Sequence, residues 1–206
     1  MFISLDGIDG GGKSTQVARL CEALRGRGYE VLAVRDPGGT ATGEAIRSLL
    51  LDSQLAMHRR AEAMLFMAAR CELVERLIRP ALQTGKVVVS DRFLLANVVY
   101  QSTTLGEANS SPLSAEELWR VGEWAVGGLR PDLTLLLDLP AEVSLRRIDR
   151  PTDRMESRGL DYLESVRQAF LRELPRAARH TLAIDATGSA DQVHSQILDS
   201  VHRHLS

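Results

Sequence analysis

Short apolar runs alternate with longer amphipathic segments along the whole chain. Short apolar runs predict strands, and uninterrupted ones predict strands covered on both faces, as in parallel sheets. The predicted strands are residues 2–5, 30–34, 86–90, 133–138 and 181–185. The predicted helices are residues 13–27, 43–51, 58–84, 114–127, 141–148, 160–179 and 189–205. Strands that alternate with helices in this way predict an α/β fold of right-handed βαβ units around a parallel sheet.

The loops that follow the predicted strands are where we expect the chemistry. In open α/β sheets, ligands gather beyond the carboxyl ends of the strands. Those loops are residues 7–15, 35–42, 91–102, the segment from Leu139 onward, and 185–188. We therefore expect the functional residues in these segments.

The composition is that of an ordinary globular protein. The chain has 206 residues, 44% hydrophobic and 25% charged, which fits a single domain over residues 1–206. A net charge of −2 gives no basic field for a nucleic acid polymer. No apolar run approaches the ~20 residues that a membrane span needs. We also expect no signal peptide, two buried reduced thiols at Cys21 and Cys71, and a cytoplasmic enzyme.

A glycine-rich segment follows the first predicted strand and opens the first predicted helix. It reads Gly7-Ile8-Asp9-Gly10-Gly11-Gly12-Lys13-Ser14-Thr15 and has the spacing G-x-x-x-x-G-K-[ST] of a phosphate-binding loop. Glycines let backbone N–H groups converge on phosphate oxygens, and the helix N-terminus adds further unsatisfied donors. Lys13 is expected to reach the β- and γ-phosphates, and Ser14 to offer its hydroxyl to Mg²⁺.

Two predicted strands end in an acidic residue that could hold Mg²⁺ or its waters, Asp91 and Asp138. Periodicity does not separate them. We favour Asp91 because Arg92 follows it, and an arginine at a strand's carboxyl end is suited to bind a second phosphate. The alternative is that the acid forms a salt bridge at the strand end.

The long helix predicted at residues 58–84 places Phe66 and Arg70 on one face, four residues apart. One interpretation is ordinary packing, which the residues taken alone favour. The other is a platform on which a base stacks on Phe66 while Arg70 bonds its carbonyl.

Five arginines fall between residues 146 and 158: Arg146, Arg147, Arg150, Arg154 and Arg158. Charge runs are usually solvated loops. We favour instead a lid at about residues 146–158 that carries an arginine to the transferring phosphoryl group. The phosphate loop contains no arginine, so the catalytic one must come from another segment.

The motifs point to a small-molecule kinase. A regulatory GTPase would need a guanine-reading N-K-x-D stretch, which the chain lacks, and a large ATPase would need more domains. Taken in order, the motifs resemble those of thymidylate kinases, which convert dTMP and ATP to dTDP and ADP. The matching segments are the phosphate loop, Arg35-Asp36-Pro37-Gly38-Gly39-Thr40, and residues 44–47, 62–70, 91–93, 100–101, 130–134 and 153–156.

The resemblance implies a role for each matching residue. In the dTMP site it implies that Phe66 stacks on thymine, Arg70 bonds its O4, and Asn97 and Gln101 contact the base edge. Tyr100 resembles the residue under the sugar. The remaining implied contacts to dTMP are Pro37, Asp9 near the 3′-hydroxyl and Mg²⁺, and Arg47 and Arg92 on the phosphate. Asp185-Ala186-Thr187 resembles the loop that touches the adenine of ATP.

The resemblance also implies the P-loop nucleoside-monophosphate-kinase fold, with a five-stranded parallel sheet of order 2-3-1-4-5, and a homodimer. Some family members carry the catalytic arginine in the phosphate loop. This chain has Gly10 there, so it is similar to the type with a lid arginine, and Arg150 and Arg154 are the candidates.

The chain departs from the family pattern at several positions. Asp36 stands where the family usually has glutamate, Ala96 and Asn97 replace a serine-rich segment, and Ser102-Thr103-Thr104-Leu105-Gly106 replaces a glycine followed by an R-G pair. We expect these changes to affect base and phosphate contacts rather than the reaction class.

The expected reaction is in-line phosphoryl transfer. The acceptor phosphate oxygen is already ionised at neutral pH, so no general base is needed. Catalysis is then positioning and charge stabilisation by Lys13, Mg²⁺, Arg92 and a lid arginine. Two alternatives stay open: a kinase acting on UMP, CMP or a deoxynucleoside, and a nucleotide-binding protein without catalysis. Lys13 and the arginine-rich segment argue against the second.

Overall fold

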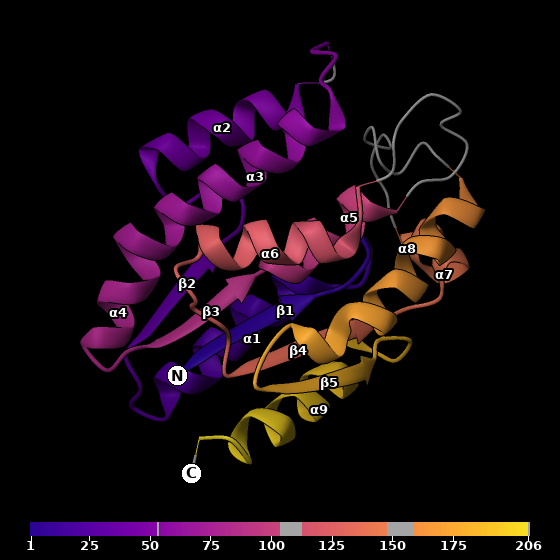
Figure 1. The fold of residues 1–206 in the computed structure, drawn as a ribbon. Helices are drawn as coiled ribbons and strands as arrows, with labels where there is room; N and C mark the ends of the chain where they lie inside the picture. The colour runs from indigo at the N-terminus through magenta and orange to yellow at the C-terminus, as the bar shows by residue number, and fades with distance from the viewer. Residues whose placement is uncertain (53, 104–112, 148–158, 206) are drawn as a thin grey trace.

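One all-parallel sheet organises the computed structural model, which describes residues 1–52, 54–103, 113–147 and 159–205 (Figure 1). Its strand order is β2-β3-β1-β4-β5. The strands are β1 (Phe2–Asp6), β2 (Val31–Arg35), β3 (Val87–Asp91), β4 (Leu133–Asp138) and β5 (His180–Asp185). Both the parallel sheet and its predicted order are confirmed.

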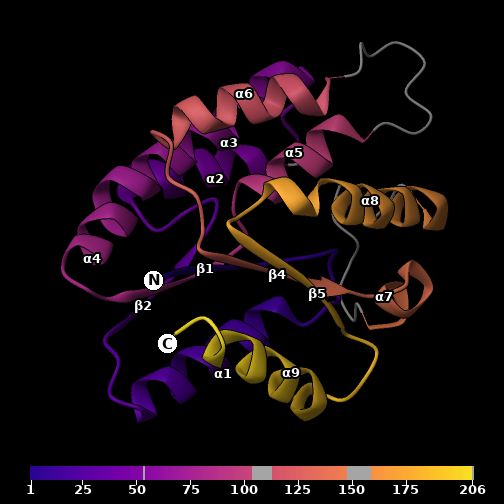
Figure 2. The same ribbon diagram turned by 60° about the horizontal axis from the view of Figure 1, so that its bottom comes forward.

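Helices cover both faces of the sheet. The helices are α1 (Lys13–Gly26), α2 (Ala41–Leu51), α3 (Arg59–Leu73), α4 (Arg79–Gln83), α5 (Leu94–Ser102), α6 (Ala115–Ala125), α7 (Ala141–Arg147), α8 (Leu160–Glu173) and α9 (Ala190–His202). A π-helical turn η1 (Val74–Ile78) joins α3 to α4, and a 3₁₀ turn η3 (Leu174–Arg176) follows α8. Helices α1 and α9 lie on one face, and α3, α5, α6 and α8 lie on the other (Figure 2).

One prediction about the helices is confirmed and one was wrong. The segment predicted as helical over residues 58–84 is helical from Arg59 to Gln83, and its turn η1 is wound i→i+5. The loop predicted after β3 contains α5 instead. Seven of the nine residues of α5 are buried, so its sequence LLANVVYQS carries no polar stripe from which a helical period could be read.

The burial of the central strands accounts for their apolar sequences. Every residue of β1 and β3 is buried, because helices cover both faces there, whereas the edge strands β2 and β5 are more exposed. Ser4 on β1 and Thr134 on β4 form a buried polar pair inside the sheet, with their hydroxyl oxygens 2.7 Å apart. Hydrogen bonding satisfies both hydroxyls, which lowers the cost of burying them.

The register brings the strand ends together at one edge. Leu5 pairs with Asp91, Arg35 pairs with Asp91, and Asp138 pairs with Asp185. The loops after these strands therefore meet there. Elsewhere, Cys21 and Cys71 are free thiols, the first buried and the second half-buried. Across the described ranges, no helix has the length and apolar character to cross a membrane.

Candidate active site

A cavity of about 730 Å³ opens at the carboxyl edge of the sheet. Its walls come from the loops after β1, β2 and β3, from α1, α2, α3 and α5, and from the end of α7. The predicted site residues that line it are Asp9, Gly10, Gly12, Lys13, Ser14, Thr15, Pro37, Arg47, Phe66, Arg70, Asp91, Arg92, Asn97, Tyr100 and Gln101. Residues that lie far apart in sequence thus converge on one space.

The glycine-rich loop is shaped by close packing against β4 and α7. A Cβ at Gly7 would lie 2.6 Å from the Leu137 carbonyl oxygen, and one at Gly10 would lie 2.8 Å from the Ser144 carbonyl oxygen. Both glycines also have positive φ, at 142° and 75°. Only glycine tolerates this combination of backbone conformation and close approach.

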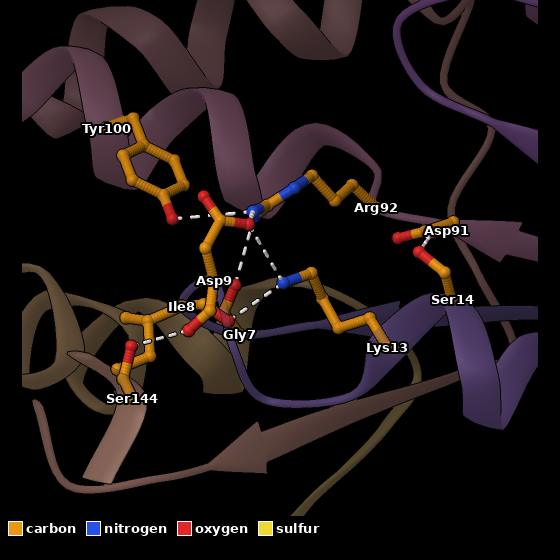
Figure 3. Close-up of polar contacts among 9 residues, drawn as sticks. All are labelled: Gly7, Ile8, Asp9, Lys13, Ser14, Asp91, Arg92, Tyr100 and Ser144. Atoms are coloured by element: carbon orange, nitrogen blue, oxygen red, sulfur yellow. Dashed lines mark hydrogen bonds and ion pairs between the residues drawn. The ribbon is translucent and has the colours of Figure 1, made fainter. Parts of the chain in front are cut away.

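Lys13 lies folded back over the loop (Figure 3). Its Nζ donates to the Ile8 carbonyl oxygen at 2.8 Å and lies 3.4 Å from the Asp9 Oδ1. Burial, together with the neighbouring Arg92 charge, lowers the pKa of Lys13 from its usual value to about 8. A buried cation beside the N-terminus of a helix favours binding of a phosphate chain.

Arg92 is held in the cavity by three contacts (Figure 3). Its guanidinium donates to the Asp9 Oδ1 at 2.6 Å, to the Gly7 carbonyl oxygen at 3.0 Å and to the Tyr100 hydroxyl at 3.4 Å. Arg92 has a φ of 70°, an uncommon backbone conformation for a residue with a side chain. Burial acts to raise the pKa of Asp9, but Arg92 and Lys13 outweigh it and hold that pKa well below its usual range.

The main chain of Asp9 is fixed from α7, because the Ser144 hydroxyl donates to its carbonyl oxygen at 2.6 Å (Figure 3). The carboxylate and the carbonyl of Asp9 are thus anchored by different elements. This leaves the loop little freedom to carry Asp9 away from Arg92.

The two acidic residues at the strand ends, Asp91 and Asp138, have different partners in the structure. The Ser14 hydroxyl donates to the Asp91 Oδ2 at 2.6 Å, so Asp91 faces the phosphate loop. Asp138 instead accepts two hydrogen bonds from Arg167 on α8, at 2.6 and 2.9 Å. The strand-end salt bridge therefore describes Asp138, whereas Asp91 lines the cavity.

The opposite wall contains a buried cation. Arg70 is 1% exposed, its Nε donates to the Asp36 carboxylate, and its Nη1 donates to the Asn97 Oδ1 at 2.9 Å. Phe66 lies one turn earlier on α3 and also lines the cavity. On α2, Arg47 donates to the Pro37 carbonyl oxygen at 2.9 Å. A ring, a cation and amides on one wall are suited to a planar polar ligand.

Comparison with known proteins gives the family. The family model described as thymidylate kinase matches residues 5–197, nearly the whole chain. The chain belongs to the thymidylate kinase family.

Several curated relatives share that name. The thymidylate kinase of Rhodopirellula baltica is 56% identical over 196 residues, covering 95% of this chain and 78% of that protein. The thymidylate kinase of Kosmotoga olearia is 40% identical over 200 residues, covering 96% and 93%. The thymidylate kinase of Neisseria meningitidis is 42% identical over 206 residues, covering 99% and 97%.

Some site residues of this thymidylate kinase family member were not predicted from the sequence. Arg147 lines the cavity and donates to the carbonyl oxygens of Ala186 and Thr187, both at 2.9 Å. It had been grouped with the lid arginines. Six of the described residues that were predicted for the ATP site are outside the lining of the cavity: Gly7, Ile8, Gly11, Asp185, Ala186 and Thr187. Ala186 and Thr187 adjoin the cavity through Arg147. The candidate lid residues Arg150 and Arg154 lie outside the described residues.

The sequence did not single out Asp6, because it follows an apolar run as the last residue of β1. It is fully buried, and burial raises its pKa to about 7, although Arg92 and Lys13 oppose the shift. In the unfolded chain the carboxyl group would lose its proton near its ordinary pKa of 3.8. The unfolded state therefore binds fewer protons between these values, and the unfolding free energy falls as pH rises from about 4 to 7.

Asp6→Asn is expected to remove this pH dependence, since asparagine does not titrate. As pH rises from 5 to 8, the unfolding free energy of the parent should fall by roughly 2–3 kcal/mol more than that of the variant, at 1.36 kcal/mol per pKa unit. Urea denaturation at both pH values measures it. Asp199→Asn, at an exposed position on α9, is the matched control and should show no such change. Equal pH profiles for the parent and Asp6→Asn would contradict the assignment.

Proposed function

We propose that this chain is a dTMP kinase, which transfers the γ-phosphoryl group of ATP to dTMP and gives ADP and dTDP for dTTP biosynthesis. The observation that carries the proposal is the cavity itself. It joins a phosphate loop with a buried lysine to a wall that offers Phe66, Arg70 and Asn97. Membership of the thymidylate kinase family supports the same assignment.

The ATP end of the cavity is assigned to the phosphate loop. Backbone N–H groups of Gly7, Ile8, Asp9, Gly10, Gly11, Gly12, Lys13, Ser14 and Thr15 would cradle the phosphates, and the positive end of α1 adds to the attraction. The adenine is assigned to Asp185, Ala186 and Thr187. The hydrogen bonds from Arg147 support this, because they tie that loop to the cavity wall.

The dTMP end is assigned to the opposite wall. Phe66 would stack on the thymine, with Arg70, Asn97 and Gln101 along its polar edge. Tyr100 and Asp9 would lie near the sugar, and Pro37, Arg47 and Arg92 near the acceptor phosphate. The support is that all these side chains line one cavity.

Catalysis would then consist of alignment and charge stabilisation. Lys13 and Arg92 supply the positive charge, and both are held by Asp9, so the two phosphates would meet between fixed cations. The acceptor oxygen is ionised at neutral pH, so no side chain has to remove a proton.

A magnesium ion is part of the proposal. Ser14 and Asp91, 2.6 Å apart, offer the hard oxygen ligands that Mg²⁺ prefers, and Asp9 lies nearby in the same cavity. Among the described residues no group of three or more metal-ligating side chains gathers, which suits an ion held mainly by phosphates and waters. When bound, such an ion neutralises charge on the transferring phosphoryl group.

The remaining assignments are also proposals. Arg150 or Arg154 would bring the catalytic arginine from the lid, which lies outside the described residues. A homodimer is supported by large exposed apolar side chains on α2, α3 and α6, namely Leu49, Met64 and Trp124. We place the enzyme in the cytoplasm.

A panel of acceptors tests the function. With ATP and Mg²⁺, the kcat/KM for dTMP should exceed those for UMP and dCMP by at least about tenfold, since a wrong base leaves a buried polar group unpaired. ADP release is measured for each acceptor and without acceptor. Equal turnover of all three acceptors would point to another nucleotide kinase. ADP release that no acceptor increases would point to a nucleotide-binding protein without transferase activity.

A further inference from the structure

A chain of hydrogen bonds crosses the cavity wall between two residues of α3. Arg70 Nη1 donates to the Asn97 Oδ1 at 2.9 Å, and the Asn97 Nδ2 donates to the Gln101 Oε1 at 2.8 Å. Gln101 Nε2 then donates to the Glu62 Oε1 at 2.9 Å. The chain thus leaves α3 at Arg70, follows one turn of α5, and returns to α3 two turns before Arg70.

The two ends of the chain fix its direction. A guanidinium only donates hydrogen bonds and a carboxylate only accepts them, whereas each amide can do either. The Asn97 oxygen must face Arg70, and the Gln101 nitrogen must face Glu62. Turning either amide around would place two donors, or two acceptors, against each other. The guanidinium of Arg70 at one end and the carboxylate of Glu62 at the other therefore determine the orientation of both side-chain amides.

Burial makes this direction costly to break. Arg70 is 1% exposed, Asn97 is 3% exposed and Gln101 is 2% exposed. Water has little access to replace a lost partner, so an unpaired amide there keeps its full desolvation cost.

The same turn of α3 also holds the main chain of α5. Arg59 Nη2 donates to the carbonyl oxygens of Gln101 and Thr103, at 2.9 and 3.1 Å. The backbone of Gln101 is therefore fixed by Arg59 while its side chain is fixed by Glu62. Glu62 itself is half-buried.

We propose that Glu62 is a positioning residue that, together with Arg70, holds the order of donors and acceptors shown to the base. The proposal rests on the assignment of Asn97 and Gln101 to the dTMP site. With the direction fixed, a donor from Arg70 lies beside an acceptor on Asn97. Thymine presents the complement, a carbonyl oxygen beside an N–H, whereas cytosine presents an amino group beside an unprotonated nitrogen. Glu62 thereby contributes to the rejection of cytosine without contacting the base.

Replacing Glu62 with leucine tests the proposal. Glu62→Leu removes the acceptor, and it should raise the KM for dTMP about tenfold, because a buried amide loses its partner. It should also lower the preference for dTMP over dCMP, while kcat and the KM for ATP stay near the parental values. Glu62→Gln keeps an oxygen acceptor and should restore most of the dTMP affinity. Glu72→Leu, on the same helix but paired with Arg76, is the matched control.

A second pair of variants keeps the test decisive if the leucine variant does not fold. Gln101→Glu sets two carboxylates against each other and should weaken dTMP binding. Adding Glu62→Gln should restore it, because the new amide donates to the new carboxylate. Failure of this rescue overturns the proposal, as does an unchanged KM for dTMP in Glu62→Leu. Lack of dTMP preference in the parent enzyme would instead overturn the proposed function, and that is measured first.

Discussion

Lys13→Met should lower kcat by about a thousandfold, the scale of losing one preorganised group that stabilises charge in the transition state. Methionine keeps the length and apolar character of the stem but removes the ammonium. Lys13 is 6% exposed and bonded to the Ile8 carbonyl oxygen, so its charge is held at the loop before a ligand binds. Removing it leaves the phosphoryl group facing the backbone donors and Arg92.

The chain provides a matched control for this experiment. Its other lysine, Lys86, lies before β3 and pairs with Glu30 at 3.4 Å, with 42% of its side chain exposed. Lys86→Met should leave kcat within about twofold, as expected for an exposed ion pair. Steady-state rates and ATP affinity are measured for both variants. A loss of less than tenfold in Lys13→Met would show that this lysine does not stabilise the transferring group.

Arg70→Ala should destabilise the protein by about 3–5 kcal/mol, the usual cost of breaking a buried ion pair from one side. The Asp36 side chain is fully buried, and Arg70 pairs with it. Burial raises the pKa of Asp36, and Arg70 opposes that shift. Without Arg70 the carboxyl group would take up a proton, and the loss of stability should grow as pH rises. The KM for dTMP should increase as well.

Removing both charges separates stability from recognition. In Arg70→Ala/Asp36→Asn no charge is left buried, so most of the lost unfolding free energy should return while the KM for dTMP stays high. Urea denaturation at neutral pH and dTMP kinetics are measured for the parent and both variants. Arg76→Ala, at an exposed position in η1, is the control. If the double variant is no more stable than Arg70→Ala, the pair is not the source of the loss.

Much of the fold followed from the sequence because its signals are local. Apolar runs marked the strands, and the glycine spacing marked the loop before α1. The order of the strands came only from the resemblance, since periodicity carries no information on which strands are neighbours. Helix α5 escaped prediction because burial on nearly all sides erased the alternation that marks a surface helix.

The site residues also fall into those that local signals predicted and those that depend on tertiary contacts. Lys13 and Asp91 could be proposed from their positions after strands, yet only packing showed that Asp138 is occupied by Arg167. Asp6 was not singled out, and the contacts of Glu62 and Arg147 were not predicted, because they depend on partners distant in sequence. In each case the missing information is a tertiary contact rather than a residue type.

The close approach of the phosphate loop to α7 bears on how members of this family diverge. A side chain at position 10 meets the carbonyl oxygen of Ser144 and requires a left-handed backbone. An arginine introduced there would need α7 to shift at the same time, and α7 is tied to the loop by the Ser144 hydroxyl. Replacing Gly10 with a residue that has a side chain is therefore an epistatic change. An evolutionary path to a side chain at position 10 has to alter the loop and its neighbouring helix together.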